Sequence, residues 1–361
     1  MEYALSNDSI SIKVSTAGGS FTSIEAGGRE YLWQGDPAVW SGQAPICFPI
    51  CGGLRDNSAM TFAGHHVKLA RHGFARKQEW KLLSQSENEL AMCLASEDNA
   101  ALLSDYPYPF KLVARYTLED AAVRVSYEVT NEGTEDMPFF IGGHPGFRCP
   151  LDEGEAYTDY ELRFEKDEAA ELCAAVPSTG LIDVTNRSKN PMVGKTLPLS
   201  HELFDFAETI FDVLESRQVT LSKKGEDKGV RLSFEGFPYL IVWSKPEGDF
   251  VAVEPWAACP PALTRTMFWS ISAAAWLPSR GRPSPVALRS RSFNELSYVW
   301  GRAFGAPETG VQYDSDRYHE PVDRYALSAR QADHRRREPR DARKDRWRQG
   351  PQREPRVAAA G

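Results

Sequence analysis

Four short motifs along the chain each place an ionisable side chain within two residues of a glycine or proline. His144 lies in "GGHPGF", Glu254 in "VAVEPW", His72 in "HGFAR" and Arg55 in "CGGLRDN". Glycine lets another group approach the backbone closely, and proline restricts the residue before it to an extended conformation. Imidazole and carboxylate are frequent general acids and bases. The motifs therefore point to acid–base chemistry, although a core histidine, a solvent-exposed strand-end glutamate and a surface loop or arginine would also fit them separately.

The elements that must position these side chains are predicted to be β-strands. Apolar residues alternate with polar ones in residues 9–14 ("SISIKV") and 121–129 ("AAVRVSYEV"), which is typical of half-buried strands. Residues 218–234 and 237–256 each favour two strands joined by a charged or glycine-containing turn. Residues 199–214 are the best candidate for a short helix. Many short strands predict an all-β fold, a large antiparallel β-sandwich or barrel.

Composition places the chain among ordinary globular proteins. It has 361 residues, of which 42% are hydrophobic and 25% charged, and it contains no apolar stretch long enough to cross a bilayer. The first residues lack the basic and apolar regions of a signal peptide. Six scattered cysteines favour reduced thiols over a disulfide framework. We therefore expect a cytoplasmic protein without a membrane partner, and the sequence does not fix its oligomeric state.

The charge changes abruptly near residue 260. Residues 1–260 hold 23 Lys and Arg against 39 Asp and Glu, whereas residues 261–361 hold 19 against 11, with Lys344 as their one lysine. We therefore predict two regions, a β-sandwich domain over 1–260 and a tail over 261–361 that is largely disordered from about residue 330 because it cannot bury a core. The arginine-rich end lacks interleaved aromatic residues apart from Trp347, so no nucleic-acid partner is expected.

Metal and nucleotide cofactors are not expected. Cys47 and Cys51 lie in "ICFPIC", but no second cysteine pair or suitable histidine spacing completes a zinc site. The sequence also contains no dinucleotide-binding or phosphate-binding glycine loop. A reaction that needs only an acid and a base fits this composition.

Taken together, the motifs resemble the aldose 1-epimerase (galactose mutarotase-like) family, most closely its LacX-like branch. The resemblance covers about residues 3–257 and rests on "YLWQGDPAVWSGQAPICFPICGGLRDN", "HGFAR", "GGHPGF", "LFDFAETIFDVLESRQVTL" and "VAVEPW", in the family's order. It implies the galactose mutarotase-like supersandwich and an isomerase that interconverts the anomers of a free aldose. One position departs from the branch, which usually has an aspartate just before "IF", whereas this chain has Ala207, Glu208 and Thr209.

The resemblance also implies roles for individual residues. Glu254 would be the base that removes the proton of the C1 hydroxyl, and His144 the acid that protonates the ring oxygen. Arg55 and His72 would hold sugar hydroxyls, and Glu208 or Asp205 would fill the third acidic position. Trp256, Phe74 and Phe147 could wall the sugar or pack in the core. Two alternatives stay open: a non-catalytic sugar-binding protein of the same fold, and a hexose-6-phosphate epimerase that uses arginines such as Arg71 and Arg76.

The segment after the last motif predicts a shifted reading frame. The resemblance implies an aspartate-rich turn, a "VLEHK"-like strand and a Gly-Glu turn before a final strand, but residues 263–272 read "LTRTMFWSIS". Permitted codons for this stretch, CTG ACC AGG ACG ATG TTC TGG AGC ATA AGC, give Asp-Gln-Asp-Asp-Val-Leu-Glu-His-Lys when read two nucleotides later. Residues 261–361 are therefore predicted to be a frameshifted tail, with the closing strands of the sandwich lost and activity below that of an intact relative.

Overall fold

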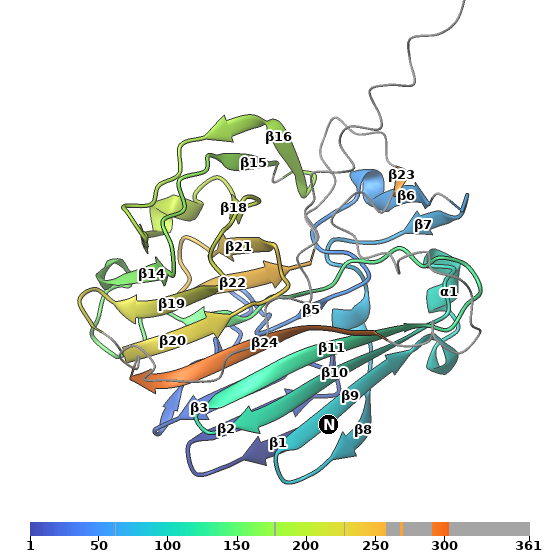
Figure 1. Ribbon diagram of the computed structural model, residues 1–361, viewed down its shortest axis with the longest axis horizontal. Coiled ribbons are helices and arrows are strands. Elements are labelled where there is room, and N and C mark those ends of the chain that lie inside the picture. Colours follow the sequence, from blue (N-terminus) through green and yellow to red (C-terminus); the bar gives the residue numbers. More distant parts are fainter. Residues whose placement is uncertain (62, 177, 227, 258–267, 270–290, 303–361) are drawn as a thin grey trace, which may run out of the picture. The chain divides into compact units, whose positions relative to one another are not determined.

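A computed structural model describes residues 1–361 except 62, 177, 227, 258–267, 270–290 and 303–361, and for 268–269 and 291–302 it describes the backbone alone. The chain divides into two compact units, Met1–Gly305 and Ala306–Gly361, and every described residue belongs to the first. Figure 1 shows that this unit is built almost entirely of strands. The prediction of an all-β, largely antiparallel fold is confirmed.

The largest element is a nine-stranded sheet in the order β17-β14-β19-β20-β24-β11-β10-β9-β8 (Figure 1). Its strands are β8 (Lys81–Gln85), β9 (Glu89–Ala95), β10 (Phe110–Glu119), β11 (Ala122–Asn131), β14 (Tyr160–Phe164), β17 (Thr196–Pro198), β19 (Gln218–Lys223), β20 (Lys228–Ser233) and β24 (Arg291–Arg302). Alternation within β11 buries Val123, Val125, Tyr127 and Val129, as the period of a half-buried strand requires. The predicted hairpin also forms, with Val219 opposite Leu232.

Two smaller sheets complete the core. A four-stranded sheet contains β1 (Glu2–Ser6), β2 (Ile10–Ser15), β3 (Phe21–Ala26) and β4 (Arg29–Glu30). A six-stranded sheet contains β5 (Ile46–Cys47), β12 (Gly142–Gly143), β13 (Gly146–Arg148), β18 (Thr209–Phe211), β21 (Tyr239–Trp243) and β22 (Phe250–Trp256). Phe21 of β3 meets Tyr116 of β10 edge to face at 4.8 Å. One continuous apolar core includes buried side chains of all three sheets, and such burial is the main stabilising term of a domain.

The remaining described elements are short. They comprise the pair β15 (Leu172–Val176) and β16 (Leu181–Ser188), the sheet of β6 (Ser58–Thr61), β7 (His66–Lys68) and β23 (Phe268–Trp269), the helix α1 (Leu102–Asp105), and the 3₁₀ turns η1 (Arg55–Asn57), η2 (Ala75–Lys77), η3 (Ser96–Asp98), η4 (Tyr157–Asp159) and η5 (His201–Phe204). The helix predicted over 199–214 is wrong. Only η5 is helical there, because Ile210 and Phe211 are buried in β18 and pair with β21.

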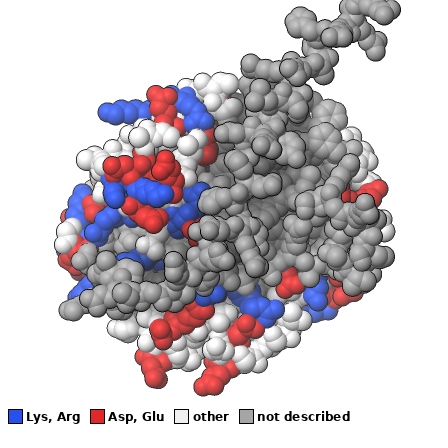
Figure 2. All heavy atoms as spheres, in the orientation of Figure 1, with Lys and Arg blue, Asp and Glu red and all other residues white. Residues whose placement is uncertain are grey.

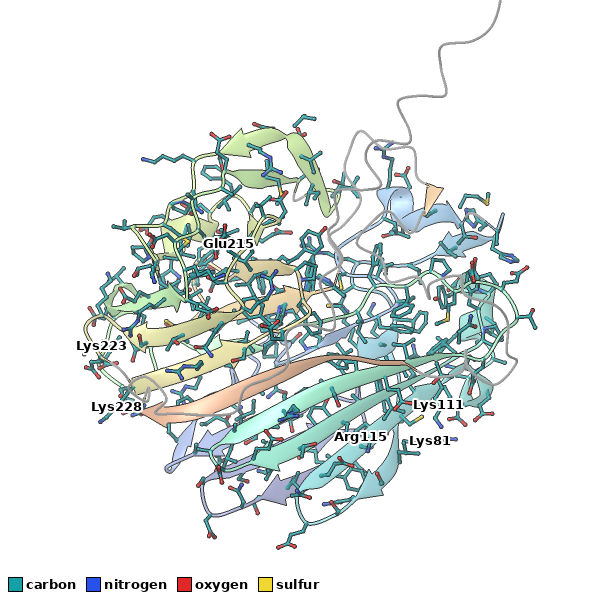
Figure 3. The ribbon with its side chains drawn as sticks, viewed as in Figure 1. Lys81, Lys111, Arg115, Glu215, Lys223 and Lys228 are labelled. Atoms are coloured by element: carbon teal, nitrogen blue, oxygen red, sulfur yellow. The ribbon has the colours of Figure 1, made fainter. Side chains whose placement is uncertain are left out.

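The solvent-facing side of the nine-stranded sheet carries charges of both signs, which Figure 2 shows mixed over the face in view. Arg115 of β10 pairs with Glu89 of β9 at 2.7 Å, and Lys81 of β8 pairs with Asp98; Figure 3 labels both basic residues. Such half-exposed pairs contribute little stability, since water screens them. Among the described residues, no helix is long and apolar enough to span a membrane.

The predicted tail falls mostly outside the described residues. Of residues 261–361, the structure describes only β23 and β24, both as strands. β24 lies between β20 and β11, with Arg302 opposite Lys228 and Val299 opposite Ala122. The division of the chain at residues 260 and 261 and the shift of reading frame stay predictions.

Candidate active site

The backbone register places His144 directly opposite Glu254. Gly142 of β12 pairs with Trp256 of β22, and Gly146 of β13 pairs with Ala252, so the residue midway between the glycines faces the residue midway between Ala252 and Trp256. The Nε2 atom of His144 lies 3.2 Å from Oε1 of Glu254. The sheet therefore brings together two residues that are more than a hundred positions apart in the sequence.

Two glycines make this close approach possible. A Cβ atom on Gly142 would lie 2.6 Å from the Trp256 ring and 3.1 Å from the Cys51 sulfur. A Cβ atom on Gly146 would lie 2.5 Å from the ring of Trp40. The two distances to the aromatic rings are far below a normal van der Waals contact. The glycines around His144 are thus required because aromatic rings occupy the space that side chains would take.

Burial of the pair alters its ionisation. His144 and Glu254 are only 7% and 2% exposed. Burial lowers the pKa of His144 to about 3, and Arg76 and Arg71 act in the same direction. Burial also raises the pKa of Glu254 well above its ordinary value, an effect to which neighbouring Cys47 and Glu208 add. Both shifts favour the uncharged forms because a low-dielectric environment penalises charge.

Oxygen and nitrogen atoms of the pair remain available for a ligand. Oε2 of Glu254 and Nδ1 of His144 are buried and make no hydrogen bond to the part of the chain that the structure describes. Buried polar atoms without partners are rare in native proteins and call for an explanation. A bound polyhydroxylated molecule would supply the missing partners.

His72 joins the pair from a separate turn. Its ring lies 5.2 Å from that of His144 and is 5% exposed, so the alternative of a solvated surface loop does not hold. The residue adopts a φ of 65°, an uncommon conformation for a non-glycine residue that often marks functional sites. The Gly52 N–H donates to Nδ1 at 3.2 Å, which directs Nε2 toward Arg71, 3.3 Å away. Burial, with His144 and the nearby arginines, lowers the pKa of His72 well below its usual value.

The remaining predicted site residues differ in their burial. Glu208 accepts a 2.7 Å hydrogen bond from Arg71 and is 13% exposed, and its charge acts on Glu254. Asp205 follows η5 and Arg55 begins η1, and both side chains are exposed to solvent. Among the carboxylates considered for the third acidic position, Glu208 is the one whose charge the structure brings to the pair. The binding roles of Arg55 and Asp205 stay predictions.

Sequence reasoning missed the rings that surround His144. Trp40 stacks on His144 with ring centres 5.3 Å apart, and Trp243 meets it edge-on at 6.0 Å. Phe74 instead packs against the core residues Phe48 and Phe110. The density of aromatic residues in "YLWQGDPAVW" was the one signal that could have identified Trp40, although a core role explains such a motif equally well.

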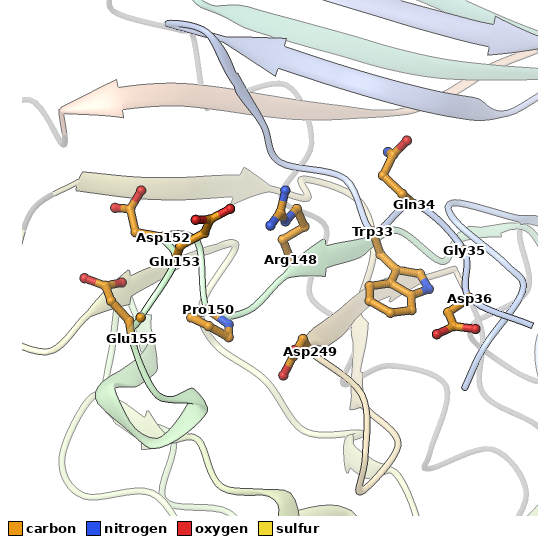
Figure 4. Close-up of a pocket in the computed structure, with 11 residues that line it drawn as sticks. Trp33, Gln34, Gly35, Asp36, Arg148, Pro150, Asp152, Glu153, Glu155 and Asp249 are labelled. Carbon is orange, nitrogen blue, oxygen red and sulfur yellow. The ribbon is translucent and has the colours of Figure 1, made fainter. Parts of the chain in front are cut away.

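A cavity of about 450 Å³ lies next to this aromatic group but contains neither His144 nor Glu254. We call it the acidic cavity because carboxylates dominate its wall: Asp36, Asp152, Glu153, Glu155 and Asp249, together with Trp33, Gln34, Gly35, Arg148, Pro150 and Gly154 (Figure 4). Most of these side chains are exposed. None of the residues predicted from sequence to act on a sugar lines it.

Comparison with known proteins identifies the family of this chain. The family model for aldose 1-epimerase matches residues 1–268. The chain is 41% identical over 273 residues to the plasmid-encoded LacX protein of Lactococcus lactis subsp. lactis, covering 73% of this chain and 90% of LacX. A galactose mutarotase-like protein from Lactobacillus casei superposes with a TM-score of 0.73 at 25% identity, over 83% of this chain and 99% of the other. A galactose 1-epimerase from Lactobacillus acidophilus superposes with a TM-score of 0.57 at 16% identity, over 82% and 93% respectively, which shows a shared fold.

Proposed function

This chain belongs to the aldose 1-epimerase family, LacX-like branch, and on that premise we propose that it is an isomerase that interconverts the α and β anomers of a free hexose. The observation that carries the proposal is the facing pair of His144 and Glu254, 3.2 Å apart and almost fully buried. Interconversion of anomers requires one proton to leave the C1 hydroxyl and one to reach the ring oxygen. Both oxygens are bonded to C1, so the acid and the base must lie close together.

The pair performs the reaction by exchanging protons with the sugar. Ionised Glu254 removes the proton from the C1 hydroxyl while protonated His144 donates a proton to the ring oxygen. The bond between C1 and the ring oxygen breaks as the C1 carbonyl forms. The carbonyl then rotates, and the reverse transfers close the ring on the other face. General acid–base catalysis of this kind contributes about 10²–10⁴-fold to the rate.

Burial makes the two residues share one proton. It shifts Glu254 toward its protonated form and His144 toward its neutral form. These shifts favour a carboxylic acid beside a neutral imidazole, and the opposite arrangement, a carboxylate beside an imidazolium, holds the same number of protons. Ring opening converts the second arrangement into the first, and ring closure restores it. The site thus returns to its starting state without exchanging protons with solvent.

The neighbouring arginines favour an unphosphorylated sugar. Arg71 already donates to the Glu208 carboxylate at 2.7 Å, and Arg76 donates to the backbone oxygen of Arg71 at 3.0 Å. A phosphate would compete with Glu208 for Arg71 and would meet a second negative charge there. A neutral hydroxyl can instead donate to the Glu208 carboxylate or pair with the His72 ring, and it adds no negative charge. We assign these two residues to binding of sugar hydroxyls, together with Arg55 and Asp205 if they reach the sugar when it is bound.

Polarimetry tests the proposed activity directly. The optical rotation of freshly dissolved α-D-glucose and α-D-galactose is followed with and without the protein near pH 7. The protein should accelerate the approach to the final rotation without changing that final value. Glucose 6-phosphate, followed by NMR of its anomeric protons, should be accelerated less than glucose.

Two outcomes would contradict the proposal. A folded protein that binds either sugar but leaves both rates at the spontaneous value would be a sugar-binding protein of the same fold. A protein that accelerates only the phosphorylated sugar would be a hexose-6-phosphate epimerase. The inference that Glu208 keeps Arg71 from binding a phosphate would then be wrong.

A further inference from the structure

One aromatic ring lies against the face of the His144 imidazole but takes no part in the proton transfers. The Trp40 indole stacks on His144 at 5.3 Å and 28° between planes. The same indole stacks on Phe250 at 5.0 Å and meets the edge of Trp243 at 5.5 Å. Offset stacking and edge-to-face contacts are the favoured geometries of aromatic pairs. Trp40 is therefore held on more than one side and in turn limits the orientation of the imidazole.

The backbone around Trp40 is shaped to hold the ring. A Cβ atom on Gly42 would lie 2.6 Å from the indole, and one on Gly146 would lie 2.5 Å from it. The carbonyl oxygen of Trp40 accepts a 2.8 Å hydrogen bond from the Trp33 indole, and Asp36 forms a β-bridge with Trp40. Trp33 itself lines the acidic cavity (Figure 4). The segment from Trp33 to Gly42 thus has one tryptophan at the cavity and one at His144.

We propose that Trp40 is a positioning residue of the acid–base site: its indole keeps the His144 imidazole facing Glu254 and stabilises the imidazolium form by a cation–π contact. This inference rests on the proposed function for its kinetic consequence. An aromatic face carries negative electrostatic potential, and tryptophan binds cations most strongly among the aromatic residues. A ring in parallel contact also hinders rotation of the imidazole, so Nε2 stays directed at the Glu254 carboxylate.

The charged and titratable groups around His144 make this stabilisation useful. Glu254 faces it from β22 and His72 from the turn before η2. Arg71 acts on it from the same turn, and Arg76 acts on it from η2. The two guanidinium groups and burial all disfavour a protonated His144. Glu254, when ionised, and the Trp40 face are the neighbours that favour it. Removal of the indole should therefore slow the step that needs imidazolium.

The test compares Trp40→Leu, which keeps an apolar side chain, with Trp40→Phe, which keeps an aromatic face. Trp40→Leu should lower kcat by about 30-fold, the rate equivalent of a cation–π contact in a desolvated site, with a much smaller change in KM. Trp40→Phe should retain kcat within about threefold. The pH profile of kcat should change in Trp40→Leu and be preserved in Trp40→Phe.

A second readout does not depend on turnover. The ¹⁵N chemical shifts of the His144 imidazole, assigned by comparison with His144→Gln, report its tautomer and protonation. They should show one fixed state in the unaltered protein and in Trp40→Phe, and a mixture in Trp40→Leu. If the protein proves inactive as an epimerase, this measurement still decides whether Trp40 positions His144.

Gly42→Ala provides a variant that shifts the indole without removing it, in case Trp40→Leu folds poorly. It should mix the His144 imidazole states in the same way, though less. Unchanged His144 shifts in both Trp40→Leu and Gly42→Ala would overturn the proposal. Equal losses of kcat in Trp40→Leu and Trp40→Phe would also overturn it, because a purely structural role does not distinguish the aromatic face.

Discussion

Two regions of the molecule gather carboxylates beside aromatic rings, and they differ in their access to water. The acidic cavity has the larger number of carboxylates and about 450 Å³ of space, but most of its side chains are exposed. The site of His144 and Glu254 has one buried carboxylate and two buried histidines. At the cavity, hydrogen bonds from Lys223 and Tyr160 lower the pKa of Glu155, whereas burial raises that of Glu254.

The difference shows that solvent exclusion, rather than the number of ionisable groups, prepares a residue for proton transfer. A carboxylate that water and lysine keep ionised is a weak base. A carboxylate whose ionised form is disfavoured takes up a proton readily and gives it back when the ring closes. The buried site should therefore account for the chemistry, and the open cavity should not.

The largest expected effect separates the two regions directly. Glu254→Gln should lower kcat for mutarotation by about 10²-fold or more, since it removes the base, and His144→Ala should do the same by removing the acid. Asp249→Asn, the matched change at the acidic cavity, should leave kcat unchanged. Polarimetry on folded variants, checked by circular dichroism, measures all three. Near-normal rates in Glu254→Gln would place the chemistry elsewhere.

A smaller effect should distinguish the buried from the exposed binding residues. His72→Ala should lower kcat/KM for a free hexose by about tenfold because it removes a buried hydrogen-bonding partner next to His144. Arg55→Ala should have a weaker effect, since the Arg55 side chain is exposed. Initial rates over a range of sugar concentrations measure both. An equal loss in Arg55→Ala would show that Arg55 reaches the bound sugar.

Replacement of Glu208 should change the preference between free and phosphorylated sugars. Glu208→Gln removes the charge that pairs with Arg71, so Arg71 becomes available to a phosphate. The ratio of the kcat/KM values for glucose 6-phosphate and glucose should rise by about tenfold or more, the effect of one charge-assisted hydrogen bond. Asp205→Asn, an exposed neighbour in the same segment, is the control. An unchanged ratio in Glu208→Gln would remove Arg71 from sugar recognition.

The smallest effect concerns stability. Glu254 has a folded-state pKa above its unfolded value of about 4.5, so its stabilising contribution is fully present below about pH 4.5 and is lost as the pH rises through the folded-state pKa. Glu254→Gln lacks this dependence. The free energy of unfolding of this variant relative to the unaltered protein should therefore increase as the pH rises above about 4.5, by at most about 1.4 kcal/mol per pH unit. Thermal unfolding at several pH values measures the difference. A constant difference, as expected for Asp249→Asn, would contradict the raised pKa.

Local patterns in the sequence predicted the strands better than their partners. Alternating residues in 10–15 and 122–131 form β2 and β11, and the hairpin of 218–234 forms with Val219 facing Leu232. The helix over 199–214 failed because burial of Ile210 in the six-stranded sheet overrides its helical spacing. Periodicity reports which face is buried, but it does not report which distant strand covers that face.

The candidate site was predicted to the same extent: local motifs identified its residues but not the contacts between them. The motifs around His144, His72 and Glu254 identified three residues that the structure brings together. Their meeting depends on the pairing of β22 with β12 and β13, a non-local contact that no short pattern encodes. Trp40 and Trp243 were missed because an aromatic residue that packs against a histidine has no spacing that distinguishes it from the core.

The predicted shift of reading frame can be tested on the gene itself. Sequencing of the gene around codons 255–275 should find an inserted or deleted nucleotide relative to its close relatives, and an uninterrupted frame would contradict the prediction.

The position of β24 has a consequence for the order of events during synthesis. Its backbone pairs with both β20 and β11, so it joins the two halves of the nine-stranded sheet. A ribosome must complete about 300 residues before this strand emerges, and until then β20 and β11 expose unpaired edges. Exposed edges invite association with other chains, and contacts between distant residues form slowly. Whatever the sequence of β24, a chaperone must protect these two edges, or β24 must be synthesised quickly, until the edges are paired.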